Sequence, residues 1–189
     1  LRNWIKRLGH PKVELKCDQE ASTVDVRNEL IKTCESTQLV PFATPKGSKG
    51  SLGRAERAHL TIGGIARSIK SSLETNINKH LTRATAVQTN KWELGPEHVL
   101  IPWLIRHAAF CTNVFQNRAN GKTAYFSQRG REYKGSMIAF GEVGMFKVIT
   151  DDKYEDRWEE GIFVGKRPET HDFMYLTETG YKTSRSGKR

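Results

Sequence analysis

The chain has 189 residues, 37% of them hydrophobic and 28% charged, and this composition excludes a disordered or fibrous protein while allowing one ordinary core and a small second module. Its formal net charge of +10 at pH 7 favours partners rich in negative charge, of which nucleic acid and anionic membrane surfaces are the commonest. Its three cysteines include no CxxC pair, so we expect neither a disulfide framework nor a zinc knuckle, and we expect an intracellular protein, nuclear or cytoplasmic and not secreted.

The N-terminal part predicts a short helix followed by a strand, a second helix and a second strand. The run LRNWIKRLG has apolar residues at helical spacing, and we expect it to be the end of a longer helix. In VELKCD apolar and polar residues alternate, as in a half-buried strand that ends at Asp18. A capping box at Ser22 then opens a helix with Val26, Leu30 and Cys34 on one face, and TQLVPFA follows as a strand. This βαβ order predicts a parallel pair within an α/β sheet.

A long helix is predicted from Arg54 onward. Glu56 lies in its first turn, on the side opposite the apolar residues. Gly63 and Gly64 each cost about 1 kcal/mol relative to Ala in a helix interior, so they indicate a kink or a close approach by another element. The apolar residues step by three or four positions and define one buried face, formed by Ala58, Ile62, Ile65, Ile69 and Leu73.

The remainder of the chain predicts one buried helix and a small β module. The polar stretch 76–97 is predicted to be an exposed connection. The helix IPWLIRHAAFCTNVF has Pro102 in its first turn, and it falls short of the roughly 20 apolar residues of a membrane span, so we expect no membrane partner. Short alternating runs then predict antiparallel strands. We therefore expect an α/β core over residues 1–135 and a small antiparallel β module with a basic tail over residues 136–189.

Two carboxylates flank the loop between the second strand and the long helix. Asp18 ends a strand and Glu56 begins a helix. A pair of acidic side chains at the carboxyl edge of a sheet can hold divalent cations such as Mg²⁺. The alternative is structural: Glu56 favours the positive end of the helix dipole and Asp18 simply ends a strand. Spacing alone favours the structural alternative.

Basic residues crowd the same loop and the start of the long helix. Lys46, Lys49, Arg54 and Arg57 could contact the phosphates of DNA there. A charged loop that is only solvated is the alternative. We expect DNA contact at these residues.

The order and spacing of several motifs resemble those of a known family. The runs KCDQE, TPKGSKGSLGRAER, IPWLIRHAAFCTNVF and GKTAYF resemble the DDE-type integrase core of retrotransposons, which has an RNase H-like fold. The runs FGEVGMFKV, RWEEGIFVGK, YLTETG and TSR are similar to the segment that follows this core in copia-type elements. The resemblance implies that Asp18 is the second catalytic aspartate and Glu56, within LGRAER, the catalytic glutamate. Both would bind Mg²⁺ or Mn²⁺.

The chain departs from the family pattern both within the motifs and at its amino-terminal end. The family has Asn where this sequence has Leu52 and Gln19. Its first catalytic aspartate would lie upstream of Leu1, and its amino-terminal HHCC zinc module is not in this sequence. The resemblance therefore implies an N-terminally incomplete core.

The resemblance implies an integrase-type nucleotidyltransferase. In the intact protein it would join element ends to a target DNA duplex, acting as a homo-oligomer, and this fragment alone would be inactive. A second possibility is a non-catalytic nucleic-acid-binding module derived from an integrase, which the net charge favours. A third is a protein-interaction domain that uses the β module.

Overall fold

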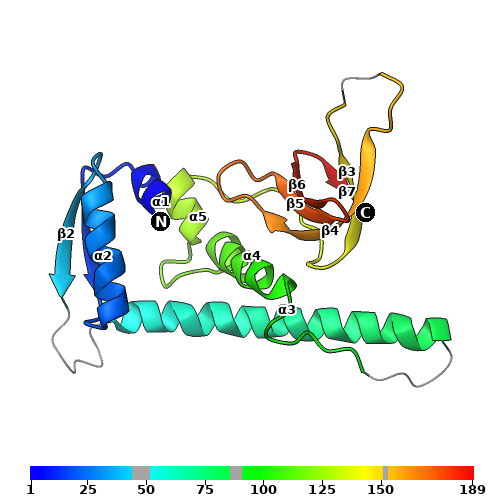
Figure 1. The fold of residues 1–189 in the computed structure, drawn as a ribbon, viewed down its shortest axis with the longest axis horizontal. Helices are drawn as coiled ribbons and strands as arrows, with labels where there is room; N and C mark the ends of the chain where they lie inside the picture. Colours follow the sequence, from blue (N-terminus) through cyan, green and yellow to red (C-terminus); the bar gives the residue numbers. More distant parts are fainter. Residues whose placement is uncertain (44–51, 86–90, 151–152) are drawn as a thin grey trace. The chain divides into compact units, whose positions relative to one another are not determined.

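The computed structural model describes residues 1–43, 52–85, 91–150 and 153–189. It combines helices and strands, as the sequence predicted, and its contacts divide the chain into two compact units, Leu1–His59 and Leu60–Arg189 (Figure 1). The boundary predicted near residue 135 lies inside the second of these units. Each unit is described by itself below.

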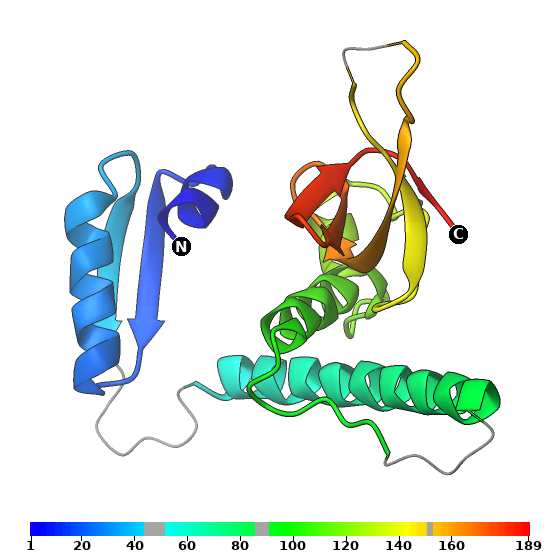
Figure 2. The same cartoon turned by 45° about the vertical axis from the view of Figure 1, so that its right-hand side comes forward.

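The first unit contains the predicted βαβ arrangement. Strands β1 (Lys12–Cys17) and β2 (Gln38–Ala43) pair in parallel, with Lys12 opposite Gln38 and Cys17 opposite Ala43 (Figure 2). Helix α2 (Ala21–Thr33) connects them, and the short helix α1 (Arg2–Arg7) precedes β1. Apolar side chains from all four elements and from the C-cap of α2 form one small core, made of Ile5, Val13, Leu15, Leu30, Ile31, Cys34 and Leu39.

Helix α2 corrects two details of the prediction. Its N-cap is Glu20, without a side-chain capping bond, so Ser22 lies within the helix and the predicted capping box is wrong. Val26 is 56% exposed, whereas Leu30 and Cys34 face the core. At 100° per residue Val26 lies about 40° from Leu30 and about 140° from Ile31, so it falls at the margin of the side of α2 that packs against the core.

Helix α3 spans Gly53–Thr85 and is longer than predicted. Its last turns belong to the stretch predicted as an exposed connection, so that prediction is wrong there. Asn78 explains the difference, because its side chain accepts a hydrogen bond from the Trp92 N–H at 2.7 Å and donates one to the Trp92 carbonyl at 2.9 Å. Leu94, in the same predicted connection, is only 1% exposed. Tertiary contacts thus order a segment that lacks strong periodicity of its own.

The two glycines within α3 have open surroundings. A Cβ atom at Gly63 would lie 3.6 Å from Nη1 of Arg67, and one at Gly64 would lie 3.9 Å from its Nη2. Among the described residues no other element comes within 4 Å of either position. Packing therefore gives no reason for glycine at these two positions.

Helix α4 (Leu100–Phe115) packs against the β module and joins α3 in the main core of the second unit. Its buried side is formed by Leu104, His107, Ala108, Phe110 and Val114, while Ile105 and Phe115 are about half exposed. The helix is thus buried on one side only, although nearly all of its residues are apolar. In the described part of the chain no helix has both the length and the apolar character needed to cross a membrane.

The predicted β module forms a five-stranded antiparallel sheet in the order β6-β5-β4-β3-β7. Its inner surface stacks Phe146 on Tyr175, with ring centroids 4.1 Å apart. The last strand passes to the far edge and pairs with the first, so much of the predicted basic tail is part of the sheet. The strands are β3 (Val143–Lys147), β4 (Trp158–Lys166), β5 (Phe173–Thr177), β6 (Gly180–Ser184) and β7 (Gly187–Lys188).

Candidate nucleic-acid interface

Asp18 lies immediately after the last residue of β1 and is exposed. Its Oδ1 atom accepts a hydrogen bond from the Gln19 N–H at 2.7 Å. Because β1 and β2 are parallel, Asp18 lies at the same edge of the sheet as Ala43, from which the chain leaves toward α3. The carboxylate thus stands at the carboxyl ends of the two strands, as the sequence predicted.

Glu56 lies in the first turn of α3 together with Arg54 and Arg57, and all three side chains are exposed. The N–H of Glu56 donates to the Leu52 carbonyl at 3.1 Å, so the helix is already formed at this residue. The positive end of the helix dipole favours a carboxylate here and would also favour a bound anion. The turn thus presents one acidic and two basic groups to solvent.

The predicted site is described only in part. Lys46 and Lys49 lie outside the described residues. Arg54, Glu56 and Arg57 are brought together by one helical turn, whereas Asp18 belongs to the sheet edge. Within the described ranges, no group of three or more His, Cys, Asp or Glu side chains is arranged to hold a metal ion.

A second basic cluster, which the sequence analysis did not identify, lies in the second unit. We call Arg129, Arg131 and Lys166 the His171 cluster, because all three act on the same imidazole. Burial lowers the pKa of His171 below its ordinary value, and the positive charges of these three residues lower that pKa further, while Asp172 opposes them. The two arginines are exposed, and Lys166 is 4% exposed. The cluster thus combines accessible guanidinium groups with a buried ammonium group.

Aromatic rings fix the position of His171. The centroid of its ring lies 5.3 Å from that of Tyr133, 5.4 Å from that of Tyr125 and 6.4 Å from that of Phe110. His171 has a φ of 62°, in the left-handed region, and its N–H donates to the Arg167 carbonyl at 2.9 Å. The loop between β4 and β5 is therefore anchored beside the arginines.

Local sequence signals position the arginines of this cluster. Helix α5 (Ala124–Arg129) begins at the N-cap Thr123, whose side chain accepts a hydrogen bond from the Phe126 N–H at 3.0 Å. It ends at Gly130, whose φ of 68° suits glycine and turns the chain directly after Arg129. The run GKTAYF, which contributed to the family resemblance, is thus a helix start that buries Tyr125 against the core.

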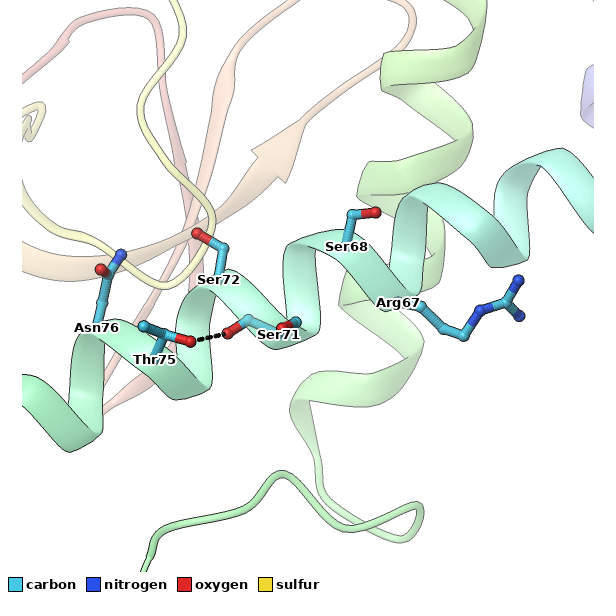
Figure 3. A pocket seen from close by; sticks show the side chains of 6 residues that line it. All are labelled: Arg67, Ser68, Ser71, Ser72, Thr75 and Asn76. Atoms are coloured by element: carbon cyan, nitrogen blue, oxygen red, sulfur yellow. Dashed lines mark hydrogen bonds between the residues drawn. The ribbon is translucent and has the colours of Figure 1, made fainter.

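The exposed face of α3 carries a shallow hollow whose six lining side chains all come from that helix (Figure 3). Two of its hydroxyl groups already donate to backbone carbonyls one turn earlier, Ser68 to Gly64 at 3.2 Å and Thr75 to Ser71 at 2.8 Å. Those hydroxyls have no proton left for a phosphate oxygen. Arg67 is the one charged residue in the lining, so this hollow is a weaker candidate for phosphate binding than the two arginine-containing sites.

Sequence reasoning missed the His171 cluster because its members are far apart along the chain. The available signal was the basic run from Arg118 to Lys134, which surrounds the GKTAYF motif. No protein-family model matches the chain, and no curated protein matches it significantly.

Proposed function

We propose that the first unit is part of an RNase H-like core of the DDE integrase type. The chain would then form part of a metal-dependent polynucleotidyl transferase that joins the ends of a DNA element to a target duplex. The observation that supports this most directly is the position of Asp18 at the carboxyl edge of a parallel βαβ unit. The next described element, α3, presents Glu56 in its first turn.

The donor chemistry of these two residues fits Mg²⁺ or Mn²⁺. Carboxylate oxygens are the ligands that hard divalent cations prefer, and Mg²⁺ is commonly bound by one or two carboxylates with water completing its shell. Both side chains are exposed, so neither is committed to the core. Such metal ions, when bound, activate a hydroxyl nucleophile and stabilise the leaving oxygen of a phosphodiester.

The basic residues would bring the DNA. Arg54 and Arg57 flank Glu56 in the first turn of α3, where the helix dipole adds to their attraction for phosphate. We propose the same role for Lys46 and Lys49, which precede this turn in the sequence. Phosphate contacts of this kind position a duplex without reading its sequence, so target binding would show little sequence preference.

Manganese binding tests the carboxylates directly. Isothermal titration of the chain with Mn²⁺ should show binding that Asp18→Asn and Glu56→Gln each weaken about tenfold, because each removes a negative charge while keeping size. Asp25→Asn and Glu29→Gln alter exposed carboxyl groups of α2 and are matched controls that should leave the titration unchanged. Equal affinity in all four variants would contradict the site.

Strand transfer gives a second test. In any longer chain that supplies a third carboxylate, joining of a labelled DNA end to a target duplex should require Mg²⁺ or Mn²⁺, and Glu56→Gln should abolish it. Near-parental joining by Glu56→Gln would show that Glu56 is not the catalytic glutamate.

A non-catalytic nucleic-acid-binding module is the second candidate. The His171 cluster favours it, because Arg129 and Arg131 present positive charge far along the chain from both carboxylates. Metal dependence separates the two candidates: a binding module would bind duplex DNA equally well in EDTA and would show no Mn²⁺ binding by Asp18 and Glu56.

A further inference from the structure

One face of the β module carries a row of apolar side chains across its three middle strands (Figure 1). Val143 lies opposite Ile162, and Ile162 lies opposite Leu176, so the three side chains point to the same face of the sheet. Helices α3 and α4 cover one end of this face, where Met174 is fully buried in the core that they form. Leu176 packs at the margin of that core. Beyond it Val143 is 59% and Ile162 37% exposed, so this end of the row is an apolar surface open to solvent.

The same row lines a groove of about 630 Å³, which we call the acidic groove. The charged residues of its described lining are the glutamates Glu159, Glu160 and Glu178. Glu159 is neutralised by Lys182, whose Nζ atom lies 2.8 Å from its Oε1. Glu160 and Glu178 are exposed, and within the described part of the chain neither forms an ion pair. Two uncompensated carboxylates thus border an apolar floor, in a chain whose net charge is +10.

The register of the sheet brings these two carboxylates together. Ile162 opposes Leu176 in the antiparallel pair of β4 and β5, so counting two residues on along each strand brings Glu160 level with Glu178, which directly follows β5. Side chains two residues apart in a strand share a face, so Glu160 lies on the same face as Ile162. Like charges at opposed positions of antiparallel strands repel each other. A cationic group bound between the two carboxylates would relieve this repulsion.

The apolar floor and the carboxylates together define the chemistry of a ligand. An exposed apolar patch with a polar rim is typical of a protein interaction site. The phosphates of nucleic acid or of an anionic membrane would be repelled by the two glutamates, whereas lysine and arginine would be attracted and would pack their aliphatic stems on the floor. We propose that the acidic groove binds a basic segment of a partner protein, with an apolar side chain on the groove floor and cationic groups beside Glu160 and Glu178.

This proposal concerns the β module alone and does not rest on the proposed DNA chemistry. The exposed arginines of the chain attract negatively charged partners, and the acidic groove selects a partner of the opposite charge. The two kinds of binding therefore respond to different substitutions.

A cationic peptide tests the groove directly. The probe is a synthetic peptide in which one tryptophan is flanked on each side by two lysines, with serine and glycine at both ends. Because the chain has a net charge of +10, such a peptide should bind only where negative charge is concentrated locally. Isothermal titration at low salt should show saturable binding. A peptide with glutamate in place of lysine, or with serine in place of tryptophan, should bind about tenfold more weakly.

Charge removal tests the role of the carboxylates. Glu160→Gln combined with Glu178→Gln should lower the affinity for the peptide about fivefold, because two exposed ion pairs are lost and each contributes little alone. Glu132→Gln combined with Glu155→Gln removes the same charge from exposed positions outside the groove. This matched control should bind the peptide as the parental chain does. Duplex DNA binding should be unchanged in both double variants.

The apolar floor is tested separately. Val143→Thr combined with Ile162→Thr keeps β-branched side chains but adds hydroxyl groups to the floor, and it should also lower the affinity about fivefold. Circular dichroism should confirm that this variant and the glutamine variants remain folded. In proton–nitrogen NMR spectra of the parental chain, the peptide should cause its largest amide shifts at Val143, Gly161 and Ile162.

Five results would overturn the proposal. They are the absence of saturable peptide binding, equal binding by the Glu160 and Glu178 double variant and its control, amide shifts that lie outside the groove, self-association of the chain that this variant abolishes, and loss of duplex DNA binding in the same variant. Self-association of that kind would assign the groove to a second copy of the chain. Loss of DNA binding would assign it to nucleic acid.

Discussion

The two units of the chain differ in how completely each buries its own core. In the second unit Phe146, Phe163 and Val164 are fully buried beneath a sheet whose last strand pairs with its first. In the described part of the first unit, Ile5 is the only apolar side chain that is 1% exposed or less. The second unit thus buries several large side chains completely, whereas the described part of the first unit buries only Ile5 to that degree. This contrast predicts different responses to mutation, pH and salt.

The largest effect is expected from the core of the β module. Phe163→Ala should lower the free energy of unfolding of the second unit by about 3–5 kcal/mol, because a fully buried ring is removed and the cavity is not refilled. Leu39→Ala in the first unit should have a smaller effect of about 2 kcal/mol, because Leu39 is 8% exposed and most of its neighbours are half-buried. Hydrogen exchange measured by mass spectrometry reads the two units separately. Equal losses of unfolding free energy in the two units would contradict the inferred difference between their cores.

Acid should weaken the second unit through His107. Burial lowers the pKa of this imidazole from 6.5 to about 4, and within the described part of the chain its Nδ1 atom has no hydrogen-bond partner. Between these two values the unfolded chain binds a proton that the folded chain excludes, so stability falls as pH decreases from 6.5 toward 4. The loss should reach about 3 kcal/mol.

Urea unfolding at pH 7 and pH 4.5 measures this effect of pH. His107→Leu should flatten the profile of the second unit, because it removes the titrating group. His80→Gln changes an exposed histidine and should leave the profile unchanged. A parental profile in His107→Leu would assign the acid sensitivity to other groups.

Alanine at Gly63 or Gly64 should stabilise α3 by about 1 kcal/mol each, because a Cβ has room at both positions and the unfolded chain loses freedom. Thermal unfolding followed by circular dichroism at 222 nm measures the change. Gly141→Ala is the matched contrast. It should destabilise the second unit, because its φ is 79° and its Cβ would lie 2.5 Å from Cδ1 of Leu73.

The smallest effects concern DNA binding and show which unit carries it. Removing Arg54 and Arg57, or Arg129 and Arg131, should reduce the slope of log affinity against log salt by about one for each phosphate that the variant no longer neutralises. Fluorescence anisotropy with several unrelated duplexes measures both double-alanine variants. A reduced slope in the first variant alone would place binding at the start of α3, and a reduced slope in the second alone would place it at the His171 cluster. Unchanged slopes in both would contradict both sites.

Local patterns predicted the elements that depend on local signals. The alternation in VELKCD became β1, and the apolar steps from Ile62 to Leu73 became the packing face of α3. Ala58, the first residue of the predicted face, is exposed, so the prediction was wrong there. The predicted parallel pair and antiparallel module were also confirmed. In each of these segments a period of two or of about 3.6 residues agrees with the final burial.

The remainder depends on contacts between distant residues. The last turns of α3 are fixed by Asn78 and the backbone of Trp92, and His171 is held by rings from three other segments. No window of neighbouring residues contains such information. For the candidate site, periodicity placed Asp18 at a strand end and Glu56 in a helix, but their proposed chemistry came from the family resemblance.

The pairing of β7 with β3 has a consequence for synthesis on the ribosome. Strands β3 to β6 follow one another as successive antiparallel neighbours and can pair as they emerge. The other edge of β3 stays unpaired until Gly187 has been synthesised, because Gly187 pairs with Phe146. At a translation rate of roughly 5–20 residues per second, about 2–8 seconds separate the appearance of these two residues. During that interval the nascent module exposes a sheet edge that the finished protein covers.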